Sequence, residues 1–73
     1  MATAHAALRG TIKSIKKAEG YGFITHSATG EDHFFHRSQV LGANWDDLEI
    51  DQQVEFIPSD GPKGPRAIEV RPR

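Results

Sequence analysis

The strongest constraint on the fold is a series of short segments in which apolar or small side chains alternate with polar ones, separated by glycine, proline and small polar residues. Alternation with a period of two is typical of half-buried strands, and no part of the chain carries a convincing long helical pattern. Glycine and proline between the segments favour the backbone conformations of turns. Five strands are therefore predicted, at residues 8–15, 21–25, 33–36, 53–57 and 66–70.

The longest connection between the predicted strands follows the third one. Residues 37–41 fit one short helical turn, and residues 42–51 form a polar loop that is interrupted by Trp45. Pro58 is expected to end the fourth strand, because proline has no N–H for a strand ladder. Residues 59–65 are then a turn-rich loop.

The length of the chain limits it to one domain. A chain of 73 residues buries only about 60% of its unfolded surface and cannot support two hydrophobic cores. Closure into a barrel is how a small sheet removes its edges, so we predict an all-β barrel of five strands. Residues 8–73 are expected to form this domain, and residues 1–7 a flexible N-terminal leader.

The residue types that are present argue against catalysis and metal binding. There is no cysteine, which excludes disulfides and thiolate metal sites. His33 and His36 are three residues apart on a predicted strand, so their rings should point to opposite faces and not share a metal ion. We therefore expect no enzyme activity, no cofactor and no metal.

The apolar segments are too short for a membrane span. No run approaches the roughly 18 residues that a spanning helix needs, and residues 1–7 have neither the basic start nor the apolar stretch of a signal peptide. We expect a soluble, cytoplasmic protein with no membrane partner.

Charges are unevenly distributed along a chain whose formal net charge is only -1. Residues 9–17 contain four basic residues and no acidic one, whereas residues 46–60 contain six acidic residues and no basic one. Residues 63–73 are again mainly basic. If the two basic segments meet in space, one face of the protein attracts anions. The alternative is that these charges are solvated and serve solubility.

The spacing of the aromatic residues is the most informative feature for function. Residues two apart on a strand share a face, so Tyr21 and Phe23 lie together, opposite Ile24. If Ile24 fills the barrel, both rings lie outside. On the next strand Phe34 and His36 share a face, and pairing the two strands as a hairpin gathers the four rings into one patch.

The opposite orientation is the competing interpretation, because aromatic side chains are usually buried. It would place Tyr21, Phe23 and Phe34 in the core. The outward orientation is favoured because Lys13 borders the patch, because basic residues flank it on both sides and because other apolar side chains can still fill the interior. Exposed rings on a small protein indicate a binding surface. Rings beside cations suit single-stranded nucleic acid, whose bases stack for about 1–3 kcal/mol each. The interior is then filled by Ile12, Ile24, Phe35, Val40, Val54, Phe56, Ile68 and Val70.

The segments 20–24 and 33–36 resemble the two ribonucleoprotein motifs of the cold-shock domain. Residues 10–13, 63–65 and 67–70 resemble the rest of that pattern, and the likeness covers roughly residues 8–71. The resemblance implies a five-stranded antiparallel OB-fold barrel that binds single-stranded DNA and RNA with little sequence selectivity. Members of this family often act as nucleic-acid chaperones that melt weak secondary structure.

The same resemblance implies a set of nucleic-acid-binding residues. They are Lys13, Tyr21, Phe23, Phe34, His36 and Trp45, with Lys63 and Arg66 bordering the groove. The chain departs from the family pattern at four positions. Ser14 replaces a usual tryptophan, Ile15 a usual phenylalanine, Glu19 a common lysine and Arg37 a common aromatic residue. The planar guanidinium of Arg37 can stack on a base and offset part of this loss.

Two functions remain open at the level of the sequence. The first is a monomeric binder of single-stranded DNA and RNA that serves as an RNA chaperone or cold-shock-type regulator. The second is an OB-like interaction module that binds a protein or a structured RNA, with single-strand binding weakened by Ser14 and Glu19.

Overall fold

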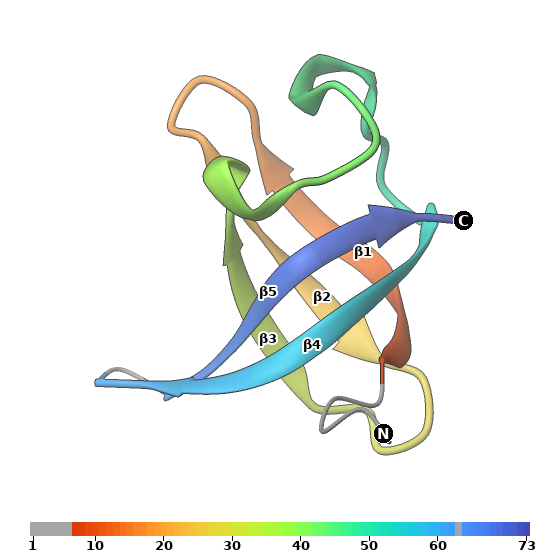
Figure 1. The fold of residues 1–73 in the computed structure, drawn as a ribbon, viewed down its shortest axis with the longest axis vertical. Helices are drawn as coiled ribbons and strands as arrows, with labels where there is room; N and C mark the ends of the chain where they lie inside the picture. Colours follow the sequence, from red (N-terminus) through yellow and green to blue (C-terminus); the bar gives the residue numbers. More distant parts are fainter. Residues whose placement is uncertain (1–6, 63) are drawn as a thin grey trace, which may run out of the picture.

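The structure, a computed structural model, describes residues 7–62 and 64–73 and forms a closed barrel of five strands (Figure 1). The order around the barrel is β1-β2-β3-β5-β4, and β4 closes it by pairing with β1. The predicted all-β, five-stranded barrel is confirmed. The strands are β1 (Leu8–Lys16), β2 (Tyr21–His26), β3 (Asp32–His36), β4 (Gln53–Gly61) and β5 (Gly64–Pro72).

Strand directions depart from the prediction at one seam of the barrel. Four neighbouring pairs are antiparallel, but β3 and β5 run parallel where Phe34 lies beside Arg66. The long connection from β3 to β4 explains this difference. It contains two short 3-10 turns, η1 (Arg37–Gln39) and η2 (Trp45–Asp47), and it carries the chain across the barrel before β4 begins.

The hairpin of β4 and β5 is longer than predicted. β4 continues through Pro58 to Gly61, where the sequence predicted an end of the strand. β1 pairs with β4 only as far as Phe56, so Pro58 lies on a stretch of β4 with a free edge, where a missing N–H is tolerated. Most of the predicted loop at 59–65 is therefore strand, and Figure 1 shows this hairpin extending beyond the barrel.

The interior confirms the predicted orientation of β2 and β3. Ile24 and Phe35 are fully buried. Gly22 lets β2 pack closely against β1, since a Cβ there would lie 2.6 Å from the carbonyl oxygen of Ser14. Leu48 and Ala67 join the core without having been predicted, and Val40 packs partly against it. The buried hydrophobic residues are Ile12, Ile24, Phe35, Leu48, Val54, Phe56, Ala67 and Val70.

The predicted core position of Ile68 is wrong. Ile68 is half-buried and lies outside the core cluster. The cause is a β-bulge, because Ile57 pairs with Ile68 while Glu55 pairs with Arg71, so β5 carries one extra residue. Glu69 adopts a positive φ of 50° at this bulge. Strict alternation therefore fails between Ile68 and the end of the strand.

The leader predicted at residues 1–7 lies outside the described residues, apart from Ala7, and it stays a prediction. Within the described part of the chain, no helix has the length and apolarity to cross a bilayer.

Candidate nucleic-acid interface

Three aromatic rings lie together on the outer face of β2 and β3. Phe23 is directly opposite Phe34 in the strand ladder, and Tyr21 is opposite His36. The Tyr21 and Phe34 rings are stacked with centroids 5.5 Å apart, and Phe23 meets both edge-on. Phe23 is 37% exposed, and the other two rings are half-buried. We call Tyr21, Phe23 and Phe34 the ring cluster.

A bulge in β1 shapes the first border of the ring cluster. Ile12 pairs with Ile24 but Ser14 pairs with Phe23, so Lys13 is the extra residue. The shift turns Ser14 to the outer face beside the cluster. The bulge also breaks the alternation along β1, where Ser14 and the next residue, Ile15, are both half-buried. A small hydroxyl side chain therefore lies beside Phe23.

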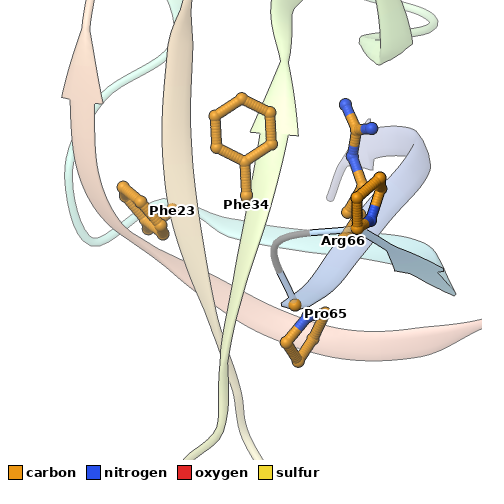
Figure 2. Close-up of a pocket in the computed structure, with 6 residues that line it drawn as sticks. Phe23, Phe34, Pro65 and Arg66 are labelled. Atoms are coloured by element: carbon orange, nitrogen blue, oxygen red, sulfur yellow. The ribbon is translucent and has the colours of Figure 1, made fainter.

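Arg66 forms the opposite border of the ring cluster. It pairs with Phe34 across β3 and β5, and its guanidinium carbon lies 5.2 Å from the centroid of the Phe34 ring. A hollow of about 460 Å³ opens between the rings and the hairpin. Figure 2 shows Phe23 and Phe34 on neighbouring strands, with Pro65 and Arg66 on the hairpin. The hollow is lined by Phe23, Phe34, Pro62, Gly64, Pro65 and Arg66.

Lys13 is the bulge residue between Ile12 and Ser14, and its charge has a partner within the protein. Its Nζ donates to Asp32 Oδ2 at 2.7 Å, and Thr25 Oγ1 donates to Asp32 Oδ1 at 2.9 Å. The hydrogen bond from Lys13, followed by that from Thr25, lowers the pKa of the Asp32 carboxyl. Sequence reasoning missed Asp32, although its position two residues before Phe34 places both on one face.

His36 and Arg37 lie where β3 ends, beside Tyr21. The exposed His36 ring accepts the backbone N–H of Ser38 at Nδ1, 3.1 Å away, which orients the ring. The backbone N–H of Arg37 donates to the carbonyl of Gly20, and the Arg37 side chain lies over this glycine. Gly20 has a φ of 83°, a backbone conformation that favours glycine. Because glycine has no side chain, the aliphatic part of Arg37 has room above it.

Trp45 lies at one end of the barrel and does not stack with the ring cluster. Its ring meets the buried Phe35 at a centroid distance of 5.8 Å, and its Nε1–H donates to the carbonyl of Lys17 at 3.1 Å. The half-buried indole thus joins η2 to the turn after β1. Its predicted role in binding stays a prediction. Lys63, the other predicted loop residue, lies outside the described residues.

The two basic segments do meet, but an acidic residue lies between them. Arg9 of β1 and Arg73 after β5 both pair with Glu55 of β4. These cations are therefore partly neutralised away from the rings. The charges that border the ring cluster come instead from Arg66, from Arg37 and from Lys16, which lies opposite Tyr21 in the ladder.

The histidines follow the predicted orientation. His33 is 3% exposed and packs against Phe56, whereas His36 is exposed on the outer face. In the described ranges, 7–62 and 64–73, no cluster of three or more histidine, aspartate or glutamate side chains is placed to hold a metal ion.

Comparison with known proteins identifies the family. The "'Cold-shock' DNA-binding domain" family matches residues 8–73. Cold shock-like protein CspA of Bordetella pertussis is 40% identical over 62 residues, which cover 85% of this chain and 92% of the relative. A cold shock-like protein of Aquifex aeolicus is 43% identical over 63 residues, covering 86% of this chain and 90% of that protein.

A solved structure supports the same assignment. The structure described as drosophila Unr CSD456 superposes with a TM-score of 0.79 at 28% identity, covering 96% of this chain but 28% of that longer chain. The closed barrel is thus an OB-fold. The role of this domain is to bind nucleic acid and not to catalyse a reaction, as the sequence predicted. The chain belongs to the cold-shock DNA-binding domain family.

Proposed function

We propose that this protein binds single-stranded DNA and RNA through the ring cluster and acts as a nucleic-acid chaperone or cold-shock-type regulator. The observation that carries the proposal is the row of three partly exposed rings beside an open hollow. Each ring offers a flat apolar face, and every base can stack on such a face whatever its sequence. Single strands present unstacked bases, so they should bind much more tightly than a duplex.

The charges around the rings support a contact with a few phosphates. Lys16 and Arg37 border the cluster, and Arg66 lies against Phe34. If about three phosphates are neutralised, the slope of log K against log salt is about -2, from roughly -0.7 per contact. Stacking then supplies the remainder of the affinity.

The test is fluorescence-anisotropy titration with a labelled oligothymidine, an unrelated single-stranded RNA and a duplex of equal length. Phe23→Ala should weaken binding to both single strands by a similar factor, because a stacking ring is lost whatever the base. Ile50→Ala is the matched control, since Ile50 is an exposed large apolar residue of the loop before β4. Equal affinity for duplex and single strand, or unchanged affinity in Phe23→Ala, would contradict the proposal.

A second function is favoured by the border at β1. Ser14 offers no stacking surface there, and the charge of Lys13 is balanced by Asp32. A surface weakened in this way also fits an interaction module that binds a protein or a structured RNA. Binding to a structured RNA without measurable binding to either single strand would favour this alternative.

We also propose that the protein is a cytoplasmic monomer. The sheet is closed, so most strands have both edges paired within the chain. A role in nucleic-acid binding places the protein in a compartment that contains RNA and DNA. Sedimentation equilibrium tests the oligomeric state, and a concentration-dependent dimer would contradict it.

A further inference from the structure

Arg66 reaches the ring cluster along the surface of the hairpin. It is paired with Ser59 on β4 and with Phe34 on β3. Its stem lies across Gly61, where an added Cβ would overlap the Arg66 Cδ atom. The guanidinium therefore approaches Phe34 from the side of the hairpin, as Figure 2 shows. Gly61 is the residue that leaves room for this path.

The guanidinium of Arg66 has no carboxylate partner among the residues that the structure describes. The lysine and arginine side chains of those residues that pair with a carboxylate are Lys13, Arg9 and Arg73, and Arg66 is not among them. Its guanidinium carbon lies 5.2 Å from the centroid of the Phe34 ring. The planar fork of five N–H donors is therefore available to a ligand in the hollow.

The guanidinium lies over the Phe34 ring and leaves no room for a base between the two planes. The guanidinium carbon is 5.2 Å from the ring centroid, whereas a base between the two planes needs about 7 Å, or two van der Waals separations of about 3.5 Å. A sandwich would require Arg66 to leave its place over Gly61. A base that lies across Phe34 and Phe23 in the hollow requires less movement and turns one edge toward Arg66.

Arg66 is the one charged side chain among the described residues that line the hollow, and the others are aromatic rings, prolines and a glycine. The side chains of the hollow can therefore select a base only through the N–H donors of Arg66. Guanine offers two adjacent acceptors, O6 and N7, that fit the arginine fork in a bidentate contact. Adenine also offers N7 as an acceptor, but its neighbouring amino group is a donor. This amino group would face the donors of Arg66 and could not form a hydrogen bond with them.

We propose that Arg66 is a specificity-determining residue that gives the subsite on Phe34 a preference for guanine over adenine. The inference rests on the proposed function, since it assumes that a base stacks on the ring cluster. It adds a preference at one position to a surface that otherwise tolerates any sequence.

The preference is measured by anisotropy titration with single-stranded hexamers that differ in one purine within the same host sequence. The purine is guanine, hypoxanthine, 7-deazaguanine or adenine. Guanine and hypoxanthine both carry O6 and N7, so they should bind equally and at least about fivefold more tightly than adenine, the lower limit for a bidentate contact. The 7-deaza base lacks N7 and should be intermediate. Equal affinity for guanine and adenine overturns the proposal.

Two variants separate the arginine fork from its charge and from the fold. Arg66→Lys keeps the charge, so the salt slope should stay the same while the guanine-to-adenine ratio falls toward one. Arg71→Lys is the matched control, because Arg71 is an exposed arginine on the same strand, and it should keep the ratio. If Arg66→Lys keeps the guanine-to-adenine affinity ratio of the unchanged protein, the proposal is overturned.

Gly61→Ala tests the path of the side chain. The added methyl group should push the flexible Arg66 stem aside and reduce the ratio, while the thermal unfolding midpoint changes little. Failure of every hexamer to bind overturns the proposed function and the preference together. Binding of all four hexamers with equal affinity overturns the preference alone.

Discussion

The two borders of the ring cluster contrast sharply. At β1 the side chains are Lys13 and Ser14, and the lysine is held by Asp32. At β5 the side chain is Arg66, which lies against Phe34 and faces an apolar hollow. The β1 border has a small hydroxyl side chain and a lysine whose charge is balanced by a carboxylate. The β5 border has a guanidinium and a concave apolar surface that can contact a ligand.

This contrast indicates where binding energy is concentrated. A lysine that already pairs with a carboxylate gains less from a phosphate, because the internal contact must be broken first. A guanidinium that lies on an aromatic ring does not use up its N–H donors. These donors can therefore bind a base that stacks nearby. We therefore expect the side of the face near β5 to dominate affinity.

The largest expected effect is the removal of the ring at the β5 border. Phe34→Ala should cost nearly 3 kcal/mol of oligonucleotide affinity, at the upper end of the range of about 1–3 kcal/mol for a stacking ring. Phe34 contacts both other rings and Arg66, so its loss disturbs the whole cluster. Phe23→Ala, nearer β1, should cost about 1 kcal/mol. Titration of both variants checks the order, and a larger loss in Phe23→Ala would reverse the comparison.

The second largest effect is expected from a substitution that adds an aromatic ring at the β1 border. Ser14→Trp places an aromatic side chain on the outer face beside Phe23 and should tighten binding by about 1 kcal/mol or more. The indole fluorescence of the new residue should be quenched on binding. Ser14→Ala is the control and should leave affinity nearly unchanged. If Ser14→Trp binds no more tightly than the control, the β1 border takes no part in stacking.

The orientation of the rings was predictable from the sequence, because it depends on a single alternation over a few residues. Ile24 and Phe35 fill the interior as the period of two required. The bulge at Glu69 was not predictable, since a positive φ at a residue other than glycine leaves no signal in the sequence. Ile68 was misplaced for this reason.

The site was harder to predict than the fold because its contacts join distant segments. Lys13 and Asp32 are 19 residues apart, and only the register of two strand pairs brings them together. The register also places Arg66 beside Phe34, which the sequence suggested only through resemblance to a family. Trp45 contacts Phe35 because η2 folds over the end of the barrel, and no periodicity covers that loop.

The third expected effect concerns the turn between β1 and β2. Glu19 is exposed beside Gly20 and Tyr21, so it repels a phosphate that approaches the rings from this side. Glu19→Lys should tighten binding and steepen the salt slope by up to about 0.7, the value of one phosphate contact. Titrations at several salt concentrations measure both quantities. No response in affinity or slope would show that nucleic acid does not pass this turn.

The smallest expected effect on binding is that of Lys13→Met at the β1 border. Because Asp32 already balances this lysine, its removal should change the salt slope by less than the roughly 0.7 of a full phosphate contact. The Arg37→Met variant is the comparison, since the Arg37 guanidinium lies over Gly20 and is in no ion pair of the described residues. A slope change in Lys13→Met as large as in Arg37→Met would mean that the lysine leaves Asp32 to bind phosphate.

The same variant has a separate effect on the pH dependence of stability. The hydrogen bond from Lys13 lowers the pKa of Asp32 in the folded protein, so the stabilising contribution is fully present above the ordinary aspartate pKa of about 3.9. It is lost as the pH falls through the lowered folded value. In Lys13→Met the pKa of Asp32 should rise toward its ordinary value, although the bond from Thr25 still lowers it. NMR titration of the Asp32 carboxyl carbon measures this shift, and an unchanged midpoint would show that the ion pair is not formed in solution.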